Sequence, residues 1–223
     1  MRGLVLRILA ALAASTANVA AQQQASPSSA KFVDYYQNAY SQGRDLIPGP
    51  QTALDPASLI NSLKLETVTP EAALTGAAFI DANNTVIKLA GIQGCLSTQQ
   101  LRMSTSSASC SMISLAGLNA ALQTASAPAG GAFPCHFLAT NTGNPPVRFA
   151  ECFFIKEDDS VQPLSEYIIR QGFAFAARSP NGMPLFPEYA AAESDAAKAK
   201  AGIWANSSFV HPYGERYRNL QMN

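Results

Sequence analysis

Four cysteines constrain the fold of this 223-residue chain more than any other feature, because cross-links decide which segments lie together. They are Cys95, Cys110, Cys135 and Cys152, and no two of them lie as close in sequence as the paired ligands of a structural zinc site. Four cysteines permit three pairings. We expect disulfides Cys95–Cys110 and Cys135–Cys152, since each closes a loop of moderate size and contributes about 3 kcal/mol in the chain-entropy description.

The N-terminus predicts export, which is the setting in which an even number of cysteines forms disulfides. Arg2 and Arg7 supply a basic region, residues 8–14 are all apolar, and residues 19–21 (VAA) fit a signal-peptidase site. The alternative, a transmembrane anchor, needs a longer apolar run to cross about 30 Å of hydrocarbon. We therefore expect a signal peptide over residues 1–21, a periplasmic or secreted protein, and no membrane span in the mature chain.

The charge balance does not support a nucleic-acid partner. The chain has 15 basic and 15 acidic residues, and removal of Arg2 and Arg7 with the signal peptide leaves the mature protein slightly acidic. Proteins that bind phosphate backbones usually present a basic surface. Nucleic acid remains a possible partner only if the protein has a local basic patch, and the sequence predicts no other partner.

Residues 22–70 form a predicted linker and N-terminal extension ahead of the main domain. Residues 22–30 are polar and of low complexity, which is typical of a flexible linker. Residues 32–43 carry aromatic side chains at helical spacing, and we expect this helix to pack on the main domain rather than to form an aromatic binding site. Asp55 followed by proline predicts a short helix over 55–63.

The main domain, residues 71–208, shows an α+β pattern, and residues 209–223 form a tail. Two β-prone runs flank a polar turn at 81–84, a second pair of strands follows a helix, and two helices complete the domain. This order predicts a closed or nearly closed sheet. The predicted strands are 73–80, 85–92, 133–140 and 147–155, and the predicted helices are 111–124, 163–171 and 189–201.

Four segments of this domain resemble the staphylococcal nuclease (thermonuclease) family. Residues 88–92 (KLAGI) resemble its R-L-A-G-I-D-A-P-E strand, and residues 148–152 (RFAEC) resemble the strand that begins with its catalytic arginine. Residues 169–174 (IRQGFA) are similar to a helix end, and residues 193–204 (ESDAAKAKAGIW) to the last helix and its I-W ending. The resemblance covers about residues 71–205.

The resemblance implies a small five-stranded OB-fold-like β-barrel with about three helices. It also implies an exported branch of the family, in which one disulfide precedes the first helix and another ties two strands. The family cleaves phosphodiester bonds with Ca²⁺, using carboxylate ligands, a glutamate that orients water, and arginines that stabilise charge on the phosphate. The residues of this chain that match catalytic positions are Asp81, Lys88 and Arg148.

Most of the family's acids are replaced here. Asn83 and Gln93 stand where metal-binding aspartates are expected, and Leu96 stands in place of the glutamate. Because neutral oxygens bind Ca²⁺ weakly and leucine cannot move a proton, we expect nuclease activity to be weak or absent. We assign no metal or cofactor ligand, and Ca²⁺ only if the nuclease site works.

The sequence thus predicts an exported binding or scaffolding module with a nuclease-like fold, in which Asp81, Lys88 and Arg148 are remnants. Two alternatives stay open. One is a divergent metal-dependent phosphodiesterase that uses these same residues on DNA or RNA. The other is a structural exported protein whose aromatic N-terminal extension contacts a partner. The chain's two histidines, His136 and His211, lie far apart and suggest no other catalytic site.

Overall fold

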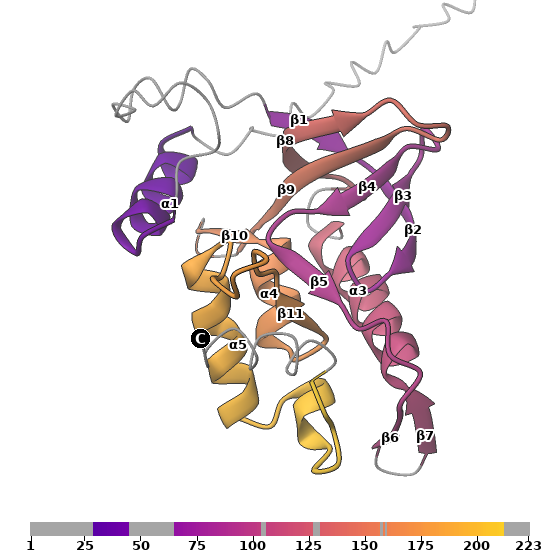
Figure 1. The fold of residues 1–223 in the computed structure, drawn as a ribbon. Coiled ribbons are helices and arrows are strands. Elements are labelled where there is room, and N and C mark those ends of the chain that lie inside the picture. The colour runs from indigo at the N-terminus through magenta and orange to yellow at the C-terminus, as the bar shows by residue number, and fades with distance from the viewer. Residues whose placement is uncertain are drawn as a thin grey trace, which may run out of the picture.

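The structure is a computed structural model that describes residues 29–44, 65–103, 106–126, 130–156, 158 and 160–211. The predicted signal peptide, the helix predicted at 55–63 and most of the tail lie outside these residues. The described chain is α+β, as expected, with four α-helices beside a mixed sheet (Figure 1). None of the helices it describes is long and apolar enough to cross a membrane.

The main sheet is open and runs in the order β1-β8-β9-β4-β3-β2, with β10 pairing to β9. The pairing of β4 with β9 is parallel, whereas the other pairs are antiparallel. The strands are β1 (Leu65–Val68), β2 (Pro70–Thr75), β3 (Ala78–Asp81), β4 (Val86–Leu89), β8 (Phe133–Asn141), β9 (Val147–Ile155) and β10 (Val161–Pro163). Two short ladders complete the strands: β5 (Ile92–Gly94) with β11 (Ala174–Ala176), and β6 (Gln100–Met103) with β7 (Ser106–Ser109).

The two predicted strands 73–80 and 85–92 are each broken in two, so that part of the prediction is wrong. Gly76 interrupts the first, where a Cβ atom would lie 1.8 Å from Ser114 Oγ. Gly91 interrupts the second with φ +70°, which L side chains rarely adopt, and a Cβ there would lie 2.1 Å from the Phe186 ring. Apolar residues stand on both sides of each glycine, so the sequence pattern does not show the breaks.

The polar turn between β3 and β4 is confirmed. Asp81 Oδ1 accepts hydrogen bonds from the backbone N–H groups of Asn83 at 2.9 Å and Thr85 at 2.8 Å. Asn84 adopts φ 59°, a left-handed conformation that asparagine tolerates. This turn makes β3 and β4 an antiparallel hairpin.

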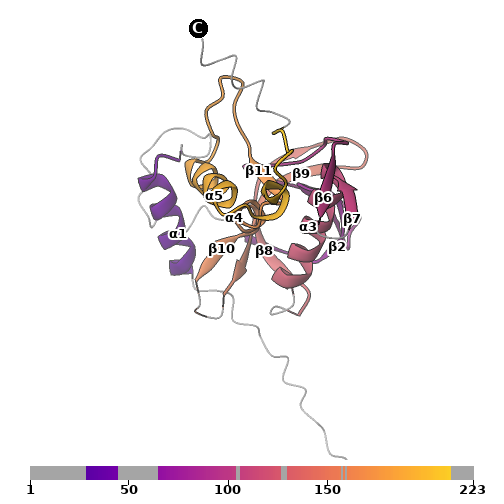
Figure 2. The same ribbon diagram turned by 90° about the horizontal axis from the view of Figure 1, so that it is seen from below.

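The helices of the domain are α3 (Cys110–Ser126), α4 (Leu164–Arg170) and α5 (Pro187–Lys198), followed by the short 3-10 helix η2 (Gly202–Ala205). They occupy the positions that the sequence predicts within a few residues. Helix α3 packs against β2 and α4 packs against α5, so the helices lie beside one another below the sheet (Figures 1 and 2). The main core lies between them and includes Phe79, Ile87, Leu118, Phe133 and Ile168, each less than 2% exposed.

Both expected disulfides are present. Cys95–Cys110 ties the segment after β5 to the start of α3, and Cys135–Cys152 joins residues directly opposite each other on β8 and β9. All four cysteines are buried. The cross-links therefore fix the β5–α3 connection and the centre of the sheet.

Helix α1 (Ser29–Ser41) packs on the domain, as predicted for the extension. Phe32 and Tyr36 are almost fully buried and pack with Phe153 of β9, in a cluster separate from the main core. The ring centroids of Phe32 and Phe153 lie 5.2 Å apart in an edge-to-face arrangement. The N-terminal helix is thus held mainly by aromatic packing on β9 and the adjacent β10.

Candidate functional site

The structure places Lys88 and Arg148 on opposite faces of the sheet. Arg148 pairs with Ile87 across the parallel β4–β9 ladder, and Lys88 pairs with Phe149. Paired residues point to the same face, and successive residues alternate between faces. The two cations matched to catalytic positions therefore do not converge. Lys88 instead places its Nζ atom 5.7 Å from the centre of the Phe149 ring.

Arg148 is already bound by a carboxylate of its own chain. Its Nη1 donates to Glu66 Oε2 at 2.8 Å, and its Nη2 donates to Glu66 Oε1 at 2.7 Å. This parallel two-bond geometry is the same one that arginine uses to bind carboxylate or phosphate groups. Glu66 comes from β1, on the other side of β8 from β9. The contact thus joins segments 82 residues apart in sequence.

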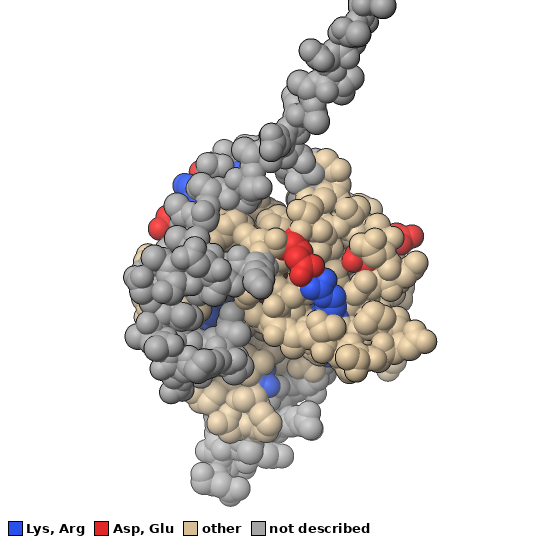
Figure 3. Space-filling model, turned by 90° about the horizontal axis from the view of Figure 1, so that it is seen from above, with Lys and Arg blue, Asp and Glu red and all other residues tan. Residues whose placement is uncertain are grey.

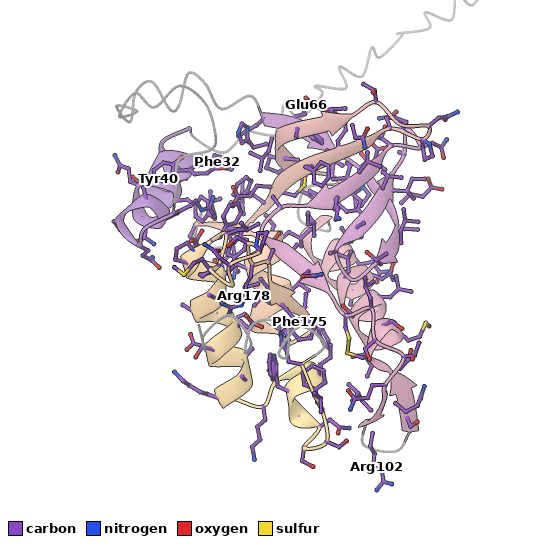
Figure 4. All side chains as sticks on the ribbon, viewed as in Figure 1. Phe32, Tyr40, Glu66, Arg102, Phe175 and Arg178 are labelled. Carbon is purple, nitrogen blue, oxygen red and sulfur yellow. A yellow bond between two sulfur atoms is a disulfide. The ribbon has the colours of Figure 1, made fainter. Side chains whose placement is uncertain are left out.

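An aromatic ring supports the Arg148 guanidinium. Its Cζ atom lies 3.3 Å from the centre of the Phe137 ring, and Phe137 projects from β8. A guanidinium stacked on an aromatic face is held in orientation by cation–π attraction. The pair stays accessible, since 27% of the Arg148 side chain and 52% of the Glu66 side chain are exposed. Figure 3 views the molecule from above, the side on which Figure 4 labels Glu66, and acidic and basic groups adjoin in that view.

The two charges favour each other's ionised forms. The hydrogen bond from Arg148 lowers the pKa of Glu66, helped by the attraction of opposite charges and opposed by slight burial. The same hydrogen bond raises the pKa of Arg148, against burial, with smaller contributions from the charges of Glu66 and Asp81. Since both side chains are largely solvated, the effect on stability is small.

The other positions matched to the nuclease motifs do not complete this site. Asp81 and Asn83 belong to the β3–β4 turn, where Asp81 bonds the backbone. Gln93 lies in β5, in the ladder with β11, and Leu96 is 66% exposed. Within the described ranges, no three His, Cys, Asp or Glu side chains gather closely enough to hold a metal ion.

A second polar cluster lies on the other face of β9, and it was missed from the sequence. Glu151 is fully buried and accepts hydrogen bonds from the hydroxyls of Tyr35, Tyr36 and Tyr189, each at 2.8 Å. It also accepts two from Arg44, from Nη2 at 2.9 Å and from Nη1 at 3.0 Å. A buried carboxylate needs such partners, because burial without them disfavours the charged form.

The pKa values in this cluster follow from burial and from Arg44. Burial raises the pKa of Glu151, but the charge of Arg44 and the hydrogen bonds from Arg44 and the tyrosines outweigh it, so the pKa lies below its usual value. Burial raises the pKa of Glu188 above its usual value, and Arg44 only partly opposes this. Of the two carboxyl groups that contact Arg44, Glu151 is therefore the one whose ionised form is favoured more strongly.

One signal in the sequence could have revealed the second cluster. Glu151 is the one acid in the strand 147–155 (VRFAECFFI) and has apolar residues directly on both sides, and an acid in a buried strand requires a cationic or hydrogen-bonding partner. The partner, Arg44, lies 107 residues earlier. Sequence spacing offers no means of pairing two such residues.

No protein-family model and no curated protein sequence matches this chain. The resemblance to staphylococcal nucleases therefore depends on the four segments of the sequence that carry it.

Proposed function

We propose that this chain is an exported, staphylococcal-nuclease-like domain that acts as a binding or scaffolding module and does not cleave phosphodiesters. The main support is the Arg148–Glu66 pair. Arg148 is the one matched side chain that keeps the identity of a family catalytic residue, and Glu66 occupies both of its outward N–H groups. A phosphate would need to displace this carboxylate before it could be bound in the same geometry.

The replaced acids support the same proposal. A Ca²⁺-dependent nuclease needs carboxylate oxygens around the ion and a group that activates water. Gln93 and Leu96 supply neither a carboxylate nor a group that activates water. One carboxylate oxygen of Asp81 already accepts hydrogen bonds from the backbone of its own turn. Bound anions would therefore be held without being cleaved.

The proposal includes an OB-like fold for the domain and export of the protein from the cytoplasm. The parallel β4–β9 pairing and the succession of hairpin, helix, hairpin and helices support an OB-like arrangement, in which the main sheet is open rather than closed into a barrel. The two disulfides are consistent with an oxidising compartment outside the cytoplasm.

The second candidate is a divergent metal-dependent phosphodiesterase. One observation favours it: Asp81 caps the turn into β4, and the first residue of β4, Val86, pairs with Val147, the neighbour of Arg148. An acid near an arginine is a minimal arrangement for binding a cation together with a phosphate.

The test is cleavage and binding of single-stranded DNA and RNA by the oxidised protein, first with Ca²⁺ and then with EDTA. We expect no metal-dependent cleavage by the wild type. Glu66→Gln removes the competing charge, so it should tighten oligonucleotide binding about tenfold without producing cleavage. Glu166→Gln is the control, because it removes one carboxylate partner of Arg170 on α4, away from Arg148, while Asp195 remains paired with Arg170.

Metal-dependent cleavage that disappears in Arg148→Ala would overturn the binding-module proposal and establish the phosphodiesterase. Equal oligonucleotide affinities of Glu66→Gln, Glu166→Gln and wild type would show that Arg148 is not an anion-binding group. Binding that rises only in Glu66→Gln, without cleavage, would support the proposal.

A further inference from the structure

The Arg44 side chain lies in a buried cage of aromatic rings and carboxylates on the side of the domain covered by α1. The cage is formed by Tyr35, Tyr36, Glu151, Phe186, Glu188 and Tyr189. Arg44 itself is 4% exposed. Figure 4 shows α1, with Phe32 and Tyr40 labelled, to the side of the sheet and well away from Glu66.

Each part of the guanidinium is recognised separately. Nε donates to Glu188 Oε1 at 2.7 Å, Nη1 donates to Glu151 Oε2 at 3.0 Å, and Nη2 donates to Glu151 Oε1 at 2.9 Å. Nη2 also contacts Glu188 and donates to the hydroxyl of Tyr35 at 2.7 Å. The Phe186 ring covers the flat face, with its centre 3.9 Å from Cζ. These contacts match the planar fork of a guanidinium, which an ammonium group lacks.

The domain supplies most of the cage without the N-terminal segment. Glu151 comes from β9, Glu188 and Tyr189 come from α5, and Phe186 precedes α5. Tyr189 donates to Glu151 Oε1 at 2.8 Å, so the carboxylate keeps a buried donor when Arg44 is absent. Glu188 Oε2 is buried without a hydrogen-bond partner among the described residues, which leaves one acceptor for a further donor.

The occupant belongs to a separable segment. Helix α1 packs through Phe32 and Tyr36 on Phe153, in a hydrophobic cluster distinct from the main core. Arg44 follows α1 directly and is held by its own contacts in the cage. Arg44 is not part of the core around Phe79 and Leu118, which the cage borders through Tyr189 and Phe186.

We propose that this cage is a guanidinium-binding site, occupied in the free protein by Arg44, and that its ligand in trans is an arginine side chain of a partner protein. Binding of that arginine exchanges it for Arg44 and releases the N-terminal segment. The site is independent of the Arg148 site, because Glu151 and Arg148 are three residues apart on β9 and alternation along the strand points them to opposite faces.

The test uses the full-length, oxidised Arg44→Ala protein and ethylguanidinium as the probe, with binding measured by calorimetry. We expect saturable binding with a dissociation constant on the order of 1 mM, which suits a ligand of this size. Ethylammonium, of equal charge, should bind at least about tenfold more weakly, because it cannot span both carboxylates and stack on Phe186. The wild type should bind neither, since Arg44 occupies the site.

Two further variants and a folding readout make the result decisive. Adding Glu151→Gln to Arg44→Ala should abolish binding, whereas adding Glu166→Gln, which lies on α4 and pairs with Arg170 outside the cage, should leave it unchanged. If Arg44→Ala does not fold alone, ethylguanidinium should restore its near-ultraviolet circular dichroism at concentrations where ethylammonium does not. Failure of ethylguanidinium both to bind and to restore folding, or equal effects of the two cations, would overturn the proposal.

Discussion

Replacement of Glu151 by glutamine should destabilise the protein far more than the same replacement of Glu66. Both residues are glutamates that receive two hydrogen bonds from one arginine. Their burial differs: the Arg44–Glu151 side chains are each 1% exposed, whereas the Arg148 and Glu66 side chains are 27% and 52% exposed. The two pairs thus share the same arginine fork but differ in burial and in the three tyrosine hydroxyls that also donate to Glu151.

The magnitude follows from the donors that surround Glu151. Three tyrosine hydroxyls and two guanidinium nitrogens point at its two oxygens. An amide nitrogen at the Oε2 position faces the hydroxyl of Tyr36, which can rotate to accept, and Arg44 Nη1, which cannot. Breaking a buried pair by removing one charge costs about 3–5 kcal/mol. Glu188 still compensates part of the Arg44 charge, so we expect about 3 kcal/mol, at the lower end of that range.

The assay is urea unfolding of the oxidised proteins, with the free energy of unfolding obtained by linear extrapolation. Glu66→Gln should lower that free energy by only about 0–1 kcal/mol, as exposed pairs do. If Glu151→Gln costs no more than Glu66→Gln, the buried network does not stabilise α1 on the domain, and the reasoning from burial is refuted.

Three further predictions test other parts of the fold. The pKa of Glu151 in the folded protein lies below its unfolded value near 4.5, so ionised Glu151 stabilises the fold above that pH and this stabilisation is lost as the pH falls. The difference in free energy of unfolding between wild type and Glu151→Gln should therefore shrink between about pH 6 and pH 3. A difference that stays constant with pH would contradict this. Gly172→Ala should lower the free energy of unfolding by more than about 2 kcal/mol, because φ is +73° and the new Cβ atom would lie 2.1 Å from the Ala201 carbonyl oxygen. Gly43 has φ +91° but open space around it, so Gly43→Ala should lower the free energy of unfolding by only about 1 kcal/mol. Replacing Cys135 and Cys152 together by alanine should lower the free energy of unfolding by about 3 kcal/mol, since the pair closes a loop with a sequence separation of 17; an unchanged urea midpoint would contradict the cross-link.

The sequence predicted those elements whose signals are local. The helix predicted at 111–124 and the strand pair predicted at 133–140 and 147–155 are confirmed within a few residues, because the local sequence pattern of such segments reflects their burial. The disulfide pairings are confirmed as well, since neighbouring cysteines in sequence close short loops. The breaks at Gly76 and Gly91 were missed because they arise from close approach of Ser114 and Phe186, which come from distant segments.

What the sequence alone determined is the class of the domain, its cross-links, and the loss of acids at positions matched to a nuclease site. Only the tertiary structure decided which charges meet. It separates Lys88 from Arg148 by the alternation of side chains across a sheet, joins Arg148 to Glu66, and buries Arg44 against Glu151 and Glu188. The physical reason is that an ion pair depends on distance in space and on the exclusion of water, and neither is encoded in the spacing of two residues along the chain.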